Sequence, residues 1–162
     1  MARFDIDMCV SQRSPGRMVR RLAKLSTAYV ETQLKARFEA LDLSFTQWIA
    51  LKVIRDGLVS NAGELARELG ITTGATTRLV DTLEEHGLLA RDRGCSDRRV
   101  VSLVLTDAGR NAAQELQSDV VGAWNDIFAD IDQAEAEAFV ATIGKLYATA
   151  ERLVDLGEET GA

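Results

Sequence analysis

Arginine is concentrated in one short segment of this 162-residue chain, where residues 90–100 carry four arginines and two aspartates. A guanidinium forms paired hydrogen bonds with a phosphate or with the base edge of guanine, and a neighbouring carboxylate can hold it in place. Two strand candidates flank the centre of the segment, residues 89–93 and residues 100–105, and the second is β-branched and apolar. The pattern predicts a two-stranded ribbon with a basic tip, a chemistry suited to nucleic acid.

The residue types that carry catalysis or bind metals are few. The chain has a single histidine, His86, and two cysteines, Cys9 and Cys95, which are far apart in sequence. No pattern pairs a nucleophile with a base, cradles a phosphate or spaces ligands for a metal. We therefore expect neither an enzyme nor a site for a metal or a cofactor.

Several features of the sequence favour a cytoplasmic protein. No apolar run is long enough to span a membrane, and the first residues are too charged for a secretory signal. The cysteines lack a pairing motif, which favours a reducing compartment.

Hydrophobic periodicity predicts a mainly α-helical protein with one small β-hairpin. Apolar residues recur at spacings of three and four over about six helices. Polar side chains that can accept a hydrogen bond from the first turn stand where each helix is expected to begin. These start signals are Ser14 before Pro15, Ser44 with Gln47, Asn61 with Glu64, Thr72, Thr106 and Asp132.

Two successive helices form a predicted helix-turn-helix. Residues 65–69 form a short helix that Gly70 ends, and a second helix, residues 72–86, begins at once and stops at Gly87. In such a pair the second helix enters the major groove of DNA, and the ribbon at residues 89–105 can reach a neighbouring minor groove. The sequence therefore predicts a winged helix-turn-helix.

The net charge of -6 is unevenly distributed. Residues 1–40 carry eight basic and four acidic side chains, residues 46–105 carry eight of each, and residues 106–162 carry three basic and twelve acidic. A polyanion would repel the last segment, so we expect that segment to face away from DNA. A basic tip on an acidic body favours binding only where the tip is correctly placed, because non-specific attraction to phosphate is then weak.

The predicted elements divide into a DNA-binding part and a larger helical part. Residues 44–106 form the winged helix-turn-helix, whereas residues 16–42 and 107–156 form long helices with more apolar surface than such a domain needs to cover itself. We expect this surface to form a homodimer, which presents two reading helices to half-sites ~34 Å apart. Residues 1–15 and 157–162 are expected to be a flexible arm and a flexible tail.

Five short stretches occur in an order and at a spacing that match one known family. They are Leu43–Trp48, Glu64–Ala66, Leu83–Leu88, Asp97–Arg99 and Leu105–Gly109. Over residues 17–155 the chain resembles the MarR family of winged-helix transcriptional regulators. The resemblance implies an obligate dimer whose first and last helices interleave. It also implies binding to a short pseudo-palindrome, most often as a repressor that a small ligand releases.

The resemblance also assigns residues to DNA contact. They are Thr72, Thr73, Gly74, Thr76, Thr77 and Arg78 on the reading helix, and Asp97, Arg98 and Arg99 on the wing. A threonine can bond a base edge and offer its methyl group to thymine, and Arg78 can pair with guanine or grip a phosphate. One of the two wing arginines is expected in the narrow minor groove, with the wing aspartate orienting it.

Alternatives to these roles stay open. The reading-helix residues could be an ordinary exposed surface, and the wing a solvated turn with an internal ion pair. Gly74 departs from the polar residue common at its position, so it either permits close approach to DNA or weakens the helix.

A ligand is expected, by resemblance, in the crevice between the dimer helices and the winged helix. Tyr29, Phe38 and Trp48 could serve an aromatic acid there, although core or surface positions also explain them. A redox-responsive regulator is a second alternative, because oxidation of Cys95 would disturb the wing and some family members sense oxidants through a cysteine placed like Cys9. A winged helix used only for protein contacts is a third; the overall acidity allows it, but the basic tip argues against it.

Overall fold

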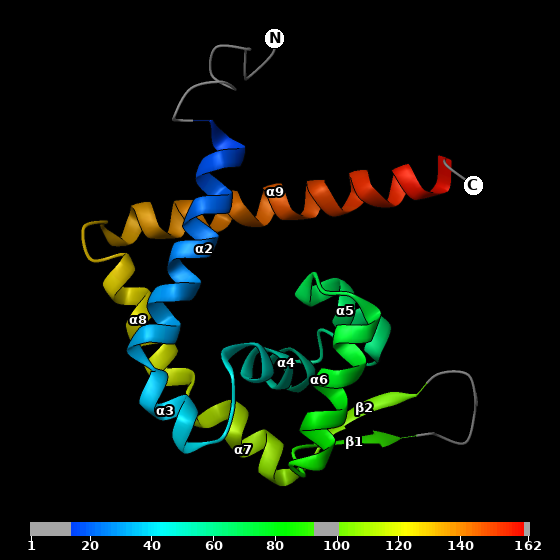
Figure 1. Ribbon diagram of the computed structural model, residues 1–162. Helices are drawn as coiled ribbons and strands as arrows, with labels where there is room; N and C mark the ends of the chain where they lie inside the picture. Colours follow the sequence, from blue (N-terminus) through cyan, green and yellow to red (C-terminus); the bar gives the residue numbers. More distant parts are fainter. Residues whose placement is uncertain (1–13, 93–100, 161–162) are drawn as a thin grey trace. The chain divides into compact units, whose positions relative to one another are not determined.

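The computed structural model describes residues 14–92 and 101–160, with side chains described as far as residue 154. This part of the protein is mainly α-helical with one two-stranded antiparallel hairpin, which confirms the predicted fold class (Figure 1). None of the helices among these residues is both long and apolar enough to cross a membrane. The elements, in chain order, are α2 (Pro15–Gln33), α3 (Lys35–Ala40), α4 (Phe45–Arg55), α5 (Ala62–Leu69), α6 (Thr73–Glu85), β1 (Leu89–Asp92), β2 (Ser102–Leu105), α7 (Asp107–Glu115), α8 (Gln117–Ile127) and α9 (Gln133–Thr160).

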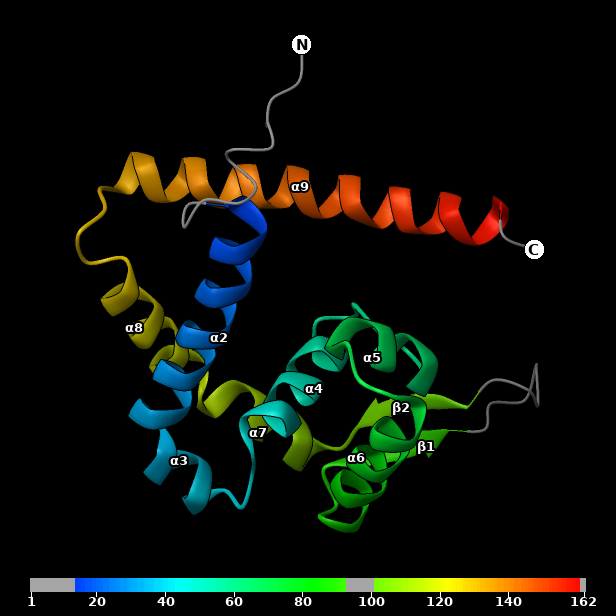
Figure 2. The ribbon, with the colours of Figure 1, turned by 45° about the horizontal axis from the view of Figure 1, so that its top comes forward.

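Two compact units divide the chain. The first runs to Ala123 and the second begins at Trp124, so the boundary lies inside α8. The first unit contains the helix-turn-helix formed by α5 and α6 and the hairpin that follows it. Strand β1 comes directly after α6 and lies against it (Figure 2).

The core of the first unit joins the elements around the helix-turn-helix. Its largest fully buried side chains include Leu51 of α4, Leu65 of α5 and Leu83 of α6. Burying a leucine stabilises the fold by roughly 1.5–3 kcal/mol relative to leaving it exposed. Leu89 of β1 pairs with Leu105 of β2 and both are buried. The hairpin is therefore anchored at its base in the same core.

Hydrogen bonds confirm most of the predicted helix starts. The Ser44 N–H donates to Gln47 Oε1 (2.6 Å) and the Gln47 N–H donates to Ser44 Oγ (3.2 Å), which completes a capping box. Four other side chains accept a backbone N–H of the first turn: Asn61, Thr72, Thr106 and Asp132. Ser14 differs, because it precedes Pro15 at the start of α2 but makes no side-chain capping bond.

Two of the predicted long helices are each broken once by a short bend that apolar spacing does not reveal. Leu34 separates α2 from α3, and Leu116 separates α7 from α8. The ψ angles of Leu34 (10°) and Leu116 (-3°) depart from helical values, while their side chains are only 4% and 0% exposed. A one-residue bend that keeps a leucine in the core preserves the apolar spacing, and for that reason periodicity did not reveal it.

The last helix continues further than the sequence indicated. Helix α9 runs to Thr160, past Gly157, where the sequence predicts a flexible tail to begin. A glycine costs a helix about 1 kcal/mol, which is too little by itself to end a long helix.

The start of α7 is fastened to the end of α6. The Thr106 hydroxyl donates to the Gly87 carbonyl oxygen (2.7 Å) and accepts from the Gly109 N–H (3.0 Å). The Thr106 N–H donates to the Leu88 carbonyl oxygen (3.2 Å). A Cβ added at Gly109 would overlap that oxygen and lie 2.9 Å from the Leu88 carbonyl carbon. Only glycine allows the two backbones to approach this closely.

Replacing Gly109 by alanine should lower the free energy of unfolding by about 1–3 kcal/mol, because the new methyl group forces α7 away from Leu88. Equilibrium urea unfolding at one fixed protein concentration measures the change. The matched control is Gly74→Ala in α6, where nothing lies within 4 Å of an added Cβ. That control should gain up to about 1 kcal/mol of helix propensity. An unfolding free energy of the Gly109→Ala variant equal to that of the parent would contradict the close approach.

Candidate DNA-contacting surface

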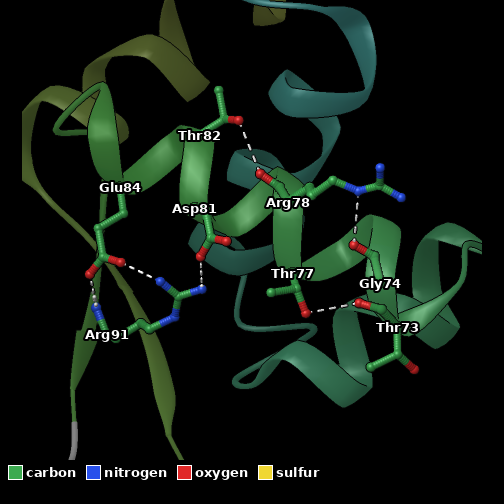
Figure 3. Close-up of polar contacts among 8 residues, drawn as sticks. All are labelled: Thr73, Gly74, Thr77, Arg78, Asp81, Thr82, Glu84 and Arg91. Atoms are coloured by element: carbon green, nitrogen blue, oxygen red, sulfur yellow. Dashed lines mark hydrogen bonds and ion pairs between the residues drawn. The ribbon is translucent and has the colours of Figure 1, made fainter.

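Helix α6 has a buried face and an exposed face. The buried face consists of three fully buried side chains, Thr76, Val80 and Leu83, each 0% exposed. The exposed face consists of Thr73, Gly74, Thr77 and Arg78. Figure 3 shows these four residues along one stretch of the helix. The buried stripe fixes the rotation of α6 about its axis, and that rotation turns the polar residues outward.

Backbone hydrogen bonds orient the polar groups of the exposed face. Thr77 Oγ1 donates to the Thr73 carbonyl oxygen (3.0 Å), and Arg78 Nε donates to the Gly74 carbonyl oxygen (3.3 Å). The Thr77 methyl group and lone pairs and the terminal N–H groups of Arg78 are left for other partners. In Figure 3 the Arg78 guanidinium extends away from the helix. Within residues 14–92 and 101–154, Arg78 forms no ion pair with a carboxylate.

Thr76 is not available for DNA contact, which corrects its assignment to the reading surface. The side chain is 0% exposed and its hydroxyl donates to the Thr72 carbonyl oxygen at 3.1 Å. The sequence held the signal that could have excluded it. Thr76 precedes Val80 by four positions and Leu83 by seven, so it shares their apolar face.

Strand β2 attaches the hairpin to the turn before α5. The Leu103 N–H donates to the Ser60 carbonyl oxygen (2.8 Å), and Ser102 forms a bridge with Asn61. Across the hairpin, Arg91 pairs with Leu103 in the strand register. The direction of the hairpin is thus fixed against the first helix of the helix-turn-helix.

Glu64 stabilises the same turn. Its carboxylate accepts from the Ser60 N–H (2.7 Å) and from the Ser60 hydroxyl (2.8 Å), while the Asn61 side chain accepts from the Glu64 N–H (3.0 Å). The predicted capping box is therefore only half correct, because the carboxylate bonds Ser60 instead of returning to Asn61. The hydrogen bonds from Ser60, first its N–H and then its hydroxyl, hold the pKa of Glu64 below its ordinary value of 4.5.

Arg91 is occupied by an internal ion pair. Its guanidinium pairs with Asp81 (2.5 Å) and with Glu84, both on α6 (Figure 3). The hydrogen bond with Asp81, then that with Glu84, raises the pKa of Arg91. From the sequence, Arg91 is one of the four arginines expected to make the ribbon basic. The pairing was missed because it joins a helix to a strand, where neither helical nor strand spacing places the side chains together.

The predicted wing tip lies outside the described residues. Asp97, Arg98 and Arg99 fall within residues 93–100, together with Cys95, and Cys9 precedes residue 14. The roles assigned to these residues stay predictions.

Two of the residues suggested for a ligand belong to the core. Phe38 and Trp48 are 5% and 3% exposed, and Phe45 stacks on Trp48 with ring centroids 6.0 Å apart. Trp48 Nε1 donates to the Ala113 carbonyl oxygen at 3.2 Å. These contacts bury both side chains, so the core position that the sequence left open describes them. Tyr29 is half-buried and packs against the same core.

The second unit exposes an aromatic hollow. Phe128 packs against Trp124 at 6.3 Å and against Phe139 at 5.5 Å between ring centroids. These rings, with Ile131 and Val140, line a hollow of about 810 Å³. Trp124 is 39% exposed and Phe139 36%. Large apolar side chains gathered at an exposed hollow are typical of a surface that binds a partner or a ligand.

The pair α5 and α6, followed by an antiparallel hairpin, defines a winged helix-turn-helix. Residues 43–101, which include α4, α5, α6 and β1, match the model of the MarR family. The chain is 30% identical over 111 residues to the uncharacterized HTH-type transcriptional regulator YcgE of Bacillus subtilis, and the match covers 68% of this chain and 72% of that protein. The chain belongs to the MarR family of DNA-binding transcriptional regulators.

Solved structures of the family have the same fold. A MarR family transcriptional regulator from Silicibacter pomeroyi is 23% identical with a TM-score of 0.71, over 90% of this chain and 96% of that chain. A MarR family protein of Mycobacterium tuberculosis, solved in complex with salicylic acid, is 23% identical with a TM-score of 0.67, over 82% of this chain and 95% of that chain.

Replacing Glu64 by glutamine should make the unfolding temperature of the protein depend less on pH in the acidic range. Folding lowers the pKa of Glu64. Its carboxylate therefore contributes stability that is fully present above pH 4.5 and is lost as the pH falls through the folded-state pKa. The variant should unfold at a lower temperature than the parent at neutral pH, and the difference should shrink on acidification. Thermal unfolding over a pH series measures this.

Glu68→Gln, an exposed change on the same helix, is the matched control and should follow the parent. If Glu64→Gln and Glu68→Gln lose stability in parallel at every pH, the Ser60 contact has no such effect.

Proposed function

We propose that this protein is a homodimeric, sequence-specific DNA-binding regulator that represses transcription from a pseudo-palindromic operator. The observation that carries the proposal is the exposed face of α6, where Arg78 projects outward with unused donors. In this arrangement the recognition helix, residues 72–86, enters the major groove and the wing, residues 89–105, reaches the adjoining minor groove.

Five residues of α6 and its cap form the proposed reading surface: Thr72, Thr73, Gly74, Thr77 and Arg78. The threonines offer hydroxyls to base edges and methyl groups to thymine, and Arg78 pairs with guanine or a phosphate. Packing does not require glycine at Gly74, because a Cβ there would meet nothing within 4 Å. Close approach of the helix backbone to DNA is therefore the better reason for it.

The wing supplies the second contact. Since Arg91 is occupied by Asp81 and Glu84, the free positive charge of the ribbon has to come from its tip. We assign minor-groove insertion to Arg98 or Arg99 and orientation of the inserted guanidinium to Asp97.

Exposed apolar side chains support the homodimer. They occur on α2 in the first unit and on α9 in the second, within the two segments assigned to dimerisation, residues 16–42 and 107–156. The most exposed are Met18, Val19, Leu25, Val140, Leu146, Tyr147, Leu153 and Val154, all more than half exposed. So much apolar surface is unusual on a monomer, and a second copy of the chain would cover it together with the aromatic hollow.

A small aromatic acid is the effector we propose. The Mycobacterium tuberculosis relative was solved with salicylic acid. With Phe38 and Trp48 in the core, Tyr29 is the remaining aromatic candidate of the three. Binding of the acid would favour a dimer arrangement that no longer fits the operator, and this would release the DNA.

Replacing Arg78, Arg98 or Arg99 by alanine should weaken binding to a duplex that the wild-type protein enriches from a random-sequence library. Loss of one base-reading arginine should cost about 1–3 kcal/mol, and loss of one phosphate contact should flatten the salt dependence of the binding constant by about one unit of slope. Fluorescence anisotropy titrations at several salt concentrations measure both quantities. Salicylate added to the wild-type titration should weaken binding.

Arg37→Gln is the control, since Arg37 is an exposed arginine of α3 that pairs with Glu115 and Asp119. It should bind like the parent. If the library yields no enriched duplex, the winged helix serves protein contacts instead. If a duplex is enriched but the arginine variants bind it with the affinity and salt dependence of the parent, the assignment of the reading surface is wrong.

A further inference from the structure

Arg91 joins the hairpin to the reading helix through three hydrogen bonds. Its guanidinium donates from Nη2 to Asp81 Oδ1 (2.5 Å) and from Nη1 to the Glu84 carboxylate. Its backbone N–H also donates to Glu84 Oε1 (3.3 Å). Figure 3 shows both carboxylates turned from α6 toward the strand. Arg91 of β1 is thereby bonded to two side chains that lie about one turn apart on α6.

This contact has more geometric than energetic consequence. The side chains of Arg91, Asp81 and Glu84 are 28%, 47% and 41% exposed. Ion pairs with this much solvent contribute only ~0–1 kcal/mol to folding. A guanidinium that bonds two carboxylates is nevertheless restricted in direction, because its donors lie in one rigid plane. The contact therefore constrains an angle more than it adds stability.

The constrained angle is the one between the two proposed DNA contacts. Asp81 lies one turn after Arg78 on α6, and Arg91 precedes the wing tip on β1. Strand β2 has its own attachment, from the Leu103 N–H to Ser60. The Arg91 contact fixes the other strand, so the hairpin is held on both edges.

We propose that Arg91 is a positioning residue that sets the direction of the wing relative to the reading helix, so that one rigid unit reaches both grooves. The proposal rests on the proposed function. Arg91 itself does not contact DNA, because its guanidinium is already engaged by Asp81 and Glu84. Loss of Arg91 removes the benefit of the wing while the reading helix continues to bind.

The direct test is a double-mutant cycle between Arg91→Gln and the tip variant Arg98→Ala/Arg99→Ala, measured on the duplex enriched by the wild-type protein. In the wild-type background Arg91→Gln should weaken binding by about two- to fivefold, because a contact that adds this little to folding can bias the orientation of the wing by no more than that. In the tip-variant background it should have little further effect, since the wing contact is already lost. A purely structural role would weaken both backgrounds equally.

A second variant separates position from charge. Arg91→Gln leaves two carboxylates unneutralised on α6, and these would repel phosphates. The triple variant Arg91→Gln/Asp81→Asn/Glu84→Gln removes that repulsion together with the contact. If the geometric role is correct, the triple variant binds as weakly as Arg91→Gln; recovery of parental affinity would overturn the proposal in favour of charge neutralisation. Arg91→Lys should restore binding only in part, because an ammonium lacks the planar fork.

Arg37→Gln is a closely matched control. Arg37 also bridges two carboxylates across elements, Glu115 at 3.4 Å and Asp119 at 3.1 Å, but none of these three residues belongs to α6 or to the hairpin. It should not couple to the tip variant. Equal effects of Arg91→Gln in both backgrounds, with the tip variant itself impaired, would overturn the positioning role and leave the proposed function intact. A wild-type protein that binds no duplex would instead overturn the proposed function.

Discussion

The structure depends on one close backbone approach, where the first turn of α7 meets the end of α6. Thr106 bonds the carbonyl oxygen of Gly87 and accepts from Gly109, and the absence of a side chain at Gly109 lets α7 lie against Leu88. A contact between two main chains has no rotamer freedom, so it fixes position more strictly than side-chain packing does. Since β2 leads directly into Thr106, the same contact holds both ends of the hairpin beside the reading helix.

From this junction the arrangement of the winged helix follows in steps. The buried stripe of α6 sets its rotation, and the exposed residues then necessarily form one polar strip. The hydrogen bond from the Leu103 N–H to the Ser60 carbonyl oxygen attaches β2 to the turn before α5, and the ion pair of Arg91 attaches β1 to α6. Helices α2 and α9 do not contribute to this strip, and they carry exposed apolar side chains. In the proposed homodimer a second copy of the chain would cover that surface and supply the second half-site.

The sequence predicts the fold best at positions where a residue type has one usual structural role. Helix caps at Ser44, Thr72 and Thr106 were recognised because a short polar side chain before an apolar stripe has few other roles. Bends at Leu34 and Leu116 were missed because tertiary packing decides them. The partners of Arg91 and Glu64 were not predicted for a related reason. Each charged side chain pairs with a residue that the fold brings near it, and the local sequence pattern does not indicate that residue. The burial of Thr76 could have been predicted, because its spacing from Val80 and Leu83 places it on their apolar face.

The central claim is that two copies of the exposed face of α6 read DNA together. The most direct measurement attaches an iron chelate to cysteine at position 77, in a Thr77→Cys variant whose Cys9 and Cys95 are serine, and maps strand cleavage on the enriched duplex. We expect two clusters of cuts from the major groove, one in each half-site, about one helical turn or ~34 Å apart. Uniform cleavage along the duplex, or cuts confined to a single site at all protein concentrations, would contradict it.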